Sequence, residues 1–215
     1  MGTFYALIAA TLVVAAADWW AVSADRRSLE YLLKPLTMVV LIAAAVSLPE
    51  AELTDGSATA RWMFVAALVC SLAGDVFLML DEKLFIGGLI AFLLGHVMYI
   101  IGLLQLDITP PLLMVGTLLV LVAAAVIGSR VVRGAQEQDA RLGVPVAIYM
   151  AVISFMVVAA IGTALPFAIA GALLFYASDG VLGWNRFVEK LPHGRLIVMT
   201  TYHLGQVGLV LALAS

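Results

Sequence analysis

VAALVCSLAGDVFLML (residues 65–80) and AIAGALLFYASDGVLGW (residues 168–184) are the stretches that decide the fold. Each is an apolar run of the kind found in membrane-spanning helices, and each contains one acid, Asp75 or Asp179, with no Lys or Arg beside it. A carboxylate in hydrocarbon costs several kcal/mol unless it is paired, hydrated or protonated. Two buried acids therefore indicate a functional site. The alternative is that they are structural acids, hydrogen-bonded between helices.

The composition of the whole chain points to a membrane protein. Of the 215 residues, 64% are hydrophobic and 12% are charged, and the mean hydropathy is +1.13. A soluble domain carries about 25% charged residues. We expect an all-α polytopic bundle, because hydrocarbon is spanned by helices and the alternating pattern of a membrane barrel is absent. The lack of a basic stripe predicts no nucleic-acid partner, whereas the net charge of -3 says little about partners in so apolar a chain.

Eight apolar runs predict eight transmembrane helices in a single domain covering residues 1–215. The predicted spans are about 3–24, 29–48, 61–80, 84–104, 111–128, 142–162, 166–185 and 195–214. The first run lacks a basic region before it and contains Asp18, so we interpret it as a helix of the mature protein rather than a signal peptide. The two longest connections are PEAELTDGSATA (49–60) and SRVVRGAQEQDA (129–140).

Basic residues are concentrated in alternate connections. The first, third, fifth and seventh connections contain Arg26, Arg27, Lys83, Arg130, Arg133, Arg141, Arg186, Lys190 and Arg195. The even connections contain only Arg61. Since Lys and Arg in short loops stay on the cytoplasmic side, both termini are predicted to lie outside the cytoplasm.

Several polar residues are predicted to share one depth in the bundle. At a rise of about 1.5 Å per residue, they lie roughly 7 to 12 Å from the cytoplasmic ends of their helices: Asp18, Lys34, Asp75, Asp179 and His203. His96 and Tyr99 lie deeper, at roughly 18 to 22 Å. We expect Asp75 and Asp179 to face one cavity with His203 at its wall. Lys34 is expected to bind phosphate, to pair with an acid such as Asp18, or to reach the interface.

A weak internal repetition accompanies this layer. Ala73-Gly74-Asp75 is echoed by Ala177-Ser178-Asp179, and each is followed by a helix with His near Gly. This order is consistent with a parallel four-plus-four repeat.

The chain resembles a known family in five motifs: LLKPLTM (32–38), SLAGDVFLML (71–80), FLLGHVMYI (92–100), LLFYASDGVLGWNRF (173–187) and TYHLGQ (201–206). Their order and spacing are similar to those of the YhhN family of bacterial membrane proteins, whose animal relatives are transmembrane lysoplasmalogenases. The resemblance implies an inner-membrane hydrolase that cleaves the vinyl ether of lysoplasmalogens, with a lysophospholipid substrate and surrounding membrane lipids as its partners. It also implies that Asp75 and Asp179 are the catalytic residues.

The chemistry of vinyl ethers is compatible with two carboxyl groups. These ethers open when a proton reaches the carbon beta to oxygen and an oxocarbenium ion forms. One protonated and one ionised carboxyl supply the donor and the stabilising charge. Our initial interpretation takes Asp75 as the acid and Asp179 as the base. Tyr202 and His203 are candidates to orient an acid or water, and Asn185 is a candidate contact to the head group.

Three alternative functions are a metal site, a serine nucleophile and a transporter. No metal or other cofactor is expected, because a hydrolytic zinc site usually has three protein ligands and no HExxH spacing exists, although two His and two Asp would suffice if the helices converged. Ser71 and Ser178 lack the GxSxG context of a nucleophile. A proton-coupled transporter of small molecules or lipids would use the same buried acids.

Overall fold

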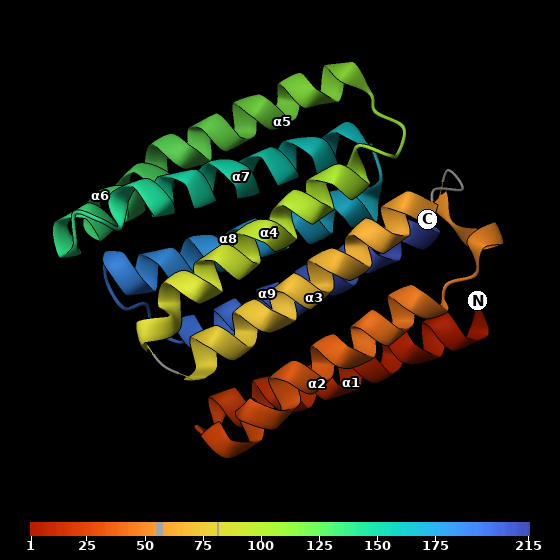
Figure 1. Ribbon diagram of the computed structural model, residues 1–215, viewed down its shortest axis with the longest axis horizontal. Helices are drawn as coiled ribbons and strands as arrows, with labels where there is room; N and C mark the ends of the chain where they lie inside the picture. The colour runs from red at the N-terminus through yellow and green to blue at the C-terminus, as the bar shows by residue number, and fades with distance from the viewer. Residues whose placement is uncertain (55–57, 81) are drawn as a thin grey trace.

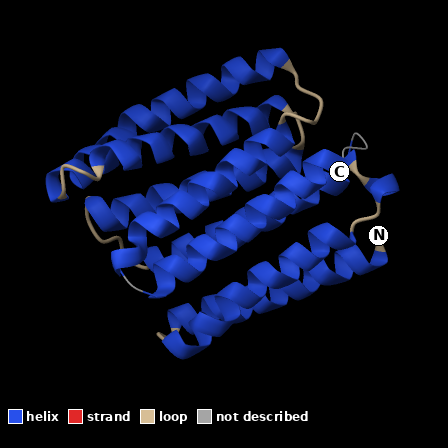
Figure 2. Ribbon diagram, in the orientation of Figure 1, coloured by secondary structure: helices blue, strands red, loops and turns tan. Residues whose placement is uncertain are grey.

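The chain forms a bundle of long helices in the computed structural model, which describes residues 1–54, 58–80 and 82–215 (Figure 1). Within those ranges every regular element is helical, and short loops join the helices (Figure 2). The spans are α1 (Gly2–Ser23), α2 (Arg27–Ser47), α3 (Ala58–Leu80), α4 (Phe85–Leu103), the continuous helix α5 to α6 (Pro110–Gln138), α7 (Gly143–Gly162), α8 (Pro166–Phe187) and α9 (Gly194–Leu211). The described residues thus hold eight helices long and apolar enough to cross a membrane, which confirms the predicted fold.

The fifth span differs from the prediction. Its parts are α5 (Pro110–Ala123), a π-helical turn (Ala124–Gly128) and α6 (Ser129–Gln138), so most of the predicted connection over residues 129–140 is helical. The prediction was wrong because it ended the span near the first charged residue, Arg130. The residues that follow form an amphipathic helix, with Val131 and Ala135 buried.

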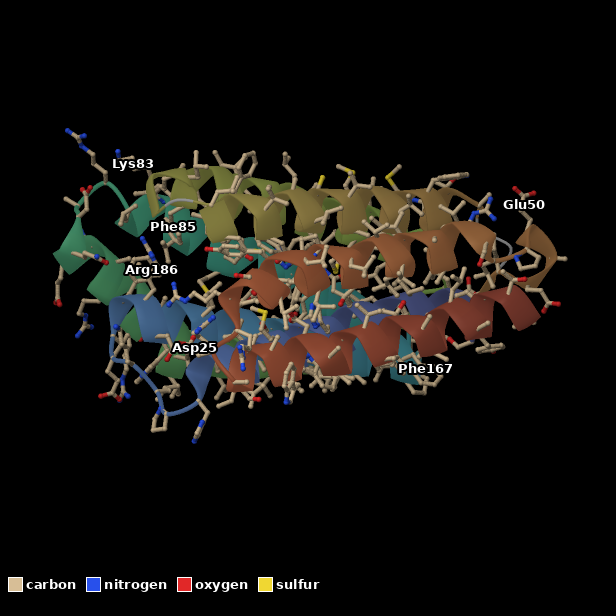
Figure 3. All side chains as sticks on the ribbon, turned by 90° about the horizontal axis from the view of Figure 1, so that it is seen from below. Asp25, Glu50, Lys83, Phe85, Phe167 and Arg186 are labelled. Atoms are coloured by element: carbon tan, nitrogen blue, oxygen red, sulfur yellow. The ribbon has the colours of Figure 1, made fainter. Side chains whose placement is uncertain are left out.

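Both ends of the chain lie at the same end of the bundle (Figure 1). Lys83, Arg186 and Asp25 lie at the opposite end, whereas Glu50 lies near the termini (Figure 3). We call the end that holds the connections after α1, α3, α6 and α8 the basic end, and the other the terminal end. The basic connections thus lie together at one end of the bundle, as the alternation of basic and non-basic connections along the sequence predicts. The side of the membrane that each end faces stays a prediction, as does the four-plus-four repeat.

Helices α8 and α9 approach each other through glycine. A Cβ atom on Gly171 would lie 2.6 Å from the backbone nitrogen of Leu209, and one on Gly205 would lie 2.9 Å from that of Phe175. Small residues let membrane helices pack closely where larger side chains would hold them apart. This contact brings Tyr202 of α9 and Asp179 of α8 to the wall of one cavity.

A packed layer lies on the terminal side of Asp75 and Asp179. It consists of Phe64, Tyr99, Phe175 and Gln206, all at most 1% exposed. The Tyr99 hydroxyl donates a hydrogen bond to Oε1 of Gln206, and the ring of Tyr99 meets that of Phe64 edge to face at 5.0 Å. We call these four residues the inner layer. It is the floor beneath the polar residues near the basic end.

Candidate active site

A cavity of about 260 Å³ opens at the basic end between α2, α3, α8 and α9. Asp75 and Asp179 both line it, as their shared depth predicts, and they are 1% and 7% exposed. Exposed Arg27 and Arg195 line its outer part. The cavity therefore runs from a charged mouth to two buried carboxyl groups.

Asp75 belongs to a buried ion pair. The Nζ atom of Lys34 lies 2.9 Å from Oδ1 of Asp75, and the Tyr202 hydroxyl donates a hydrogen bond of 2.7 Å to Oδ2. The Lys34 side chain is only 7% exposed, so the two charges face each other away from bulk solvent. A close cation and a hydrogen-bond donor both favour the ionised carboxylate. Of the two carboxyl groups, Asp75 is thus the one with a cation beside it.

Asp179 has different neighbours. The Tyr149 hydroxyl donates a hydrogen bond to its Oδ2, and Nε2 of His96 lies 3.8 Å from the same oxygen. Asp179 therefore has a phenol and an imidazole where Asp75 has an ammonium group. The Tyr149 hydroxyl favours the carboxylate of Asp179, as Tyr202 favours that of Asp75, but burial without a close cation favours the protonated form.

Tyr149 was missed by the sequence analysis. It lies six residues after the start of α7 at Gly143, in an otherwise apolar part of that helix near the basic end. The sequence signal that could have revealed Tyr149 is its depth in the helix, which is similar to that of the other polar residues. Tyrosine is common in membrane helices near the interface, however, so a single one does not stand out as a polar residue does.

The predicted pairing of Lys34 with Asp18 is wrong, because Lys34 contacts Asp75. Asp18 is fully buried on α1, and its Oδ2 lies 4.0 Å from Nδ1 of His203. Equal depth places residues in one layer but says nothing of their direction around the helix axis. Lys34 and Asp18 share a layer and have different partners.

His203 does not line the cavity as predicted. Its Nδ1 accepts a hydrogen bond of 3.1 Å from Nε1 of Trp19, on the side of α1. The preceding residue, Tyr202, forms the cavity wall instead. Successive residues on a helix point about 100° apart, since there are 3.6 residues per turn, so only one of the two can face the site.

The remaining predicted residues lie outside the cavity lining. His96 lies behind Asp179, and Tyr99 belongs to the inner layer. Asn185 accepts a hydrogen bond of 2.8 Å from the backbone nitrogen of Leu191 and packs against Gly194, so it shapes the connection between α8 and α9. Asn185 therefore has a structural contact where a head-group contact was expected.

Ion pairs order the cavity mouth. Arg195 at the start of α9 contacts Glu30 at 2.5 Å and Asp25 at 3.1 Å. These contacts join the connection after α1 to α9, and Arg27 adds a further positive charge. The mouth is polar and charged, as the head group of an amphiphile would require.

The polar groups that line the cavity are three carboxyls, one lysine amine, two guanidinium groups, two phenols and the Ser178 hydroxyl. In the ranges 1–54, 58–80 and 82–215, no three His, Cys, Asp or Glu side chains are grouped so that they could hold a metal ion. These groups can donate, accept and stabilise charge. The arrangement is suited to acid–base chemistry on a molecule that reaches the site from the basic end.

Fold and site together define a polytopic helical membrane protein with a cavity near one face that holds two buried carboxyl groups. The family model of the YhhN family matches residues 29–213, so the chain belongs to the YhhN family. The match leaves out α1, which carries Asp18 and Trp19.

Curated relatives are named lysoplasmalogenases. Lysoplasmalogenase TMEM86B of Homo sapiens is 35% identical over 146 residues, which are 68% of this chain and 61% of the relative. The protein of that name from Mus musculus is 34% identical over 159 residues, which are 73% of this chain and 65% of the relative. The one from Rattus norvegicus is 31% identical over 181 residues, which are 83% of this chain and 70% of the relative. The chain thus matches less than two thirds of the human and mouse relatives. No solved structure matches it significantly.

Proposed function

We propose that this protein is a lysoplasmalogenase-like hydrolase, which cleaves the vinyl ether bond of a lysoplasmalogen to a fatty aldehyde and a glycerophospho head group. The observation that carries the proposal is a single cavity with two buried carboxyl groups in unlike surroundings. The names of the curated relatives support the choice of substrate.

The neighbours of the two acids suggest their roles. Asp75, paired with Lys34, is the carboxylate, and Asp179, bonded to Tyr149, is the proton donor. This assignment is the reverse of our interpretation from sequence. Environments that favour opposite protonation states distinguish the acid from the base in other two-carboxyl enzymes.

The reaction then proceeds by proton transfer and addition of water. The Asp179 carboxyl protonates the vinyl carbon on the chain side, which leaves an oxocarbenium ion that the Asp75 carboxylate stabilises. Water adds to the cationic carbon, and Asp75 accepts the proton that the water releases. When the hemiacetal collapses, Asp75 returns this proton to the glycerol oxygen as the carbon–oxygen bond breaks. The Asp179 carboxylate accepts the hydroxyl proton, so both groups regain their starting states.

The proposed location is the bacterial inner membrane, with both termini outside the cytoplasm. The basic end and the cavity mouth then face the cytoplasm, in agreement with the positive-inside rule. A lysophospholipid in the inner leaflet would place its head group at Arg27 and Arg195. Its chain would remain within the depth of the membrane.

Purified protein incubated in D₂O with a lysoplasmalogen tests this proposal. The released aldehyde, reduced at once to the alcohol and examined by mass spectrometry, should carry one deuterium on the carbon next to the former carbonyl. The saturated ether analogue, which lacks the double bond, should release nothing. If the vinyl ether substrate yields no aldehyde, the hydrolase is wrong and the transporter alternative gains. If the aldehyde lacks deuterium, the activity stands and protonation at carbon is wrong.

A further inference from the structure

A second cavity lies on the other side of Asp179. It has a volume of about 40 Å³ and lies between α4, α6, α7 and α8. Asp179 lines both cavities, together with Leu78, Phe92 and Leu182. The remaining lining is apolar apart from Tyr149 and Arg186. Asp75, in contrast, lines only the polar cavity.

The second cavity leads to a groove on the side of the bundle. This groove, of about 860 Å³, lies between α7 and the continuous helix α5 to α6. Met150 lines both the second cavity and the groove, and it is 8% exposed. A methionine side chain has three rotatable bonds and adapts to irregular space. Met150 is thus placed where a small movement would connect the two spaces.

The π-helical turn faces this point. A Cβ atom on Gly128, the last residue of the turn, would lie 3.7 Å from Cε of Met150. This is an ordinary van der Waals distance, so the Met150 methyl group lies close to the turn without being crowded by it. Short π-helical turns often occur at functional sites. The groove is lined mostly by apolar residues, among them Val120, Leu121 and Phe155.

We propose that the second cavity and the groove bind the alkenyl chain of the substrate, which passes Met150. This inference rests on the proposed function and specifies how the lipid lies in the site. The head group occupies the polar cavity, the vinyl ether lies at Asp179, and the chain runs through the apolar cavity into the groove. The two products of the reaction, the head group and the chain, then lie in different cavities.

The regiochemistry of the reaction supports this orientation. The proton must reach the vinyl carbon on the chain side of the double bond, whereas water adds to the carbon attached to oxygen. Asp179, the proposed donor, borders the apolar cavity as well as the polar one. Asp75, the proposed acceptor of the water proton, borders only the polar cavity, where water has access.

The volumes of the cavities also support this orientation of the substrate. The polar cavity, at about 260 Å³, is below the range of about 300 to 1,000 Å³ usual for small-molecule sites. A head group and glycerol would occupy it, and a long chain needs further space. The groove provides that space inside the depth of the membrane.

Met150→Trp tests the proposed path by narrowing it. For a long-chain and a short-chain lysoplasmalogen, the ratio of kcat/KM, long over short, should fall by about tenfold or more, since a pocket that lacks room for a few atoms discriminates by that order. Met114→Trp on α5 is the matched control, because Met114 is 76% exposed and lines none of the three cavities. It should keep the wild-type ratio.

A second variant and a binding measurement complete the test. Met150→Ala widens the passage and should raise the ratio of kcat/KM for a chain with a methyl branch over an unbranched chain. Binding of the uncleavable saturated ether lysolipid should weaken in Met150→Trp and not in Met114→Trp. If neither Met150 variant alters its ratio or its binding, the path is wrong. If the analogue binds as expected but the wild type releases no aldehyde, the path stands and the hydrolase is wrong.

Discussion

Asp75 and Asp179 lie at the wall of one cavity, but they differ in what holds them. Lys34 and Tyr202 contact Asp75, whereas Tyr149 and His96 are the polar neighbours of Asp179. Two equally placed carboxyls would compete for one proton. Here the surroundings of the two carboxyls differ, so replacing each acid should have a different effect on stability.

Asp75→Asn and Asp179→Asn should each slow aldehyde release by about 10²- to 10⁴-fold, the usual contribution of general acid–base catalysis. Asp75→Asn should also destabilise the protein by about 3 to 5 kcal/mol, because it leaves the buried Lys34 charge without its partner. Among the residues that the structure describes, Asp179 has no Lys or Arg paired with it, so Asp179→Asn leaves no buried charge unpaired and should retain the stability of the protein. Activity assays and thermal unfolding in detergent measure both effects.

The double variant Lys34→Met with Asp75→Asn is the control for this difference. It should recover stability without recovering activity, since the unpaired charge is gone but the proton acceptor is still missing. Near-native aldehyde release by the Asn variants would show instead that the carboxyls are structural.

Hydropathy alone identified the two acids, because a charged residue inside an apolar run is visible in one sequence. Their partners were not predictable. Residue spacing gives depth along a helix, but the direction of Lys34 toward Asp75, rather than Asp18, depends on how the helices are rotated and packed. Tyr149 was hidden for a related reason, as its role appears only when α7 is placed beside α8.

Helices α8 and α9 tolerate only small side chains where their glycines meet. Gly171 meets the backbone of α9, whereas a Cβ atom on Gly180 of the same helix would have nothing within 4 Å. The position of the site relative to Tyr202 depends on this contact. Its energetic importance can be measured with two glycine substitutions.

Gly171→Ala should lower stability by about 1 to 3 kcal/mol, the usual effect of overpacking, because its Cβ would lie 2.6 Å from the backbone nitrogen of Leu209. Gly180→Ala should instead be neutral or stabilising by up to about 1 kcal/mol, since alanine favours a helix over glycine. Thermal unfolding of both variants decides. Equal stability would mean that α8 and α9 can separate without loss.

Span positions were predictable from apolar runs, and the end of the fifth span was not. A hydropathy criterion detects where hydrocarbon ends, whereas a helix ends where its backbone changes direction. The 29 residues from Pro110 to Gln138 would extend about 43 Å, or about 13 Å more than the hydrocarbon core requires. The surplus, α6, carries Arg130 and Arg133 and packs on α7 and α8 at the basic end.

The whole bundle is polarised, with nearly all basic residues of the connections at one end and the termini at the other. Cys introduced at Gly2 or Ser215, in a Cys70→Ala background, should react with an impermeant thiol reagent in intact cells. Cys in place of exposed Lys190, at the basic end, should react only after the membrane is opened. Protection of both termini in intact cells would reverse the proposed topology.

The inner layer has an electrical consequence. A bacterial membrane works as a charged capacitor, and a protein that exchanged protons with both of its sides would discharge it. Phe64, Tyr99, Phe175 and Gln206 place buried, mostly aromatic side chains between the two carboxyls and the terminal end. The proposed reaction would then draw its protons from the basic end alone and leave the gradient across the membrane intact.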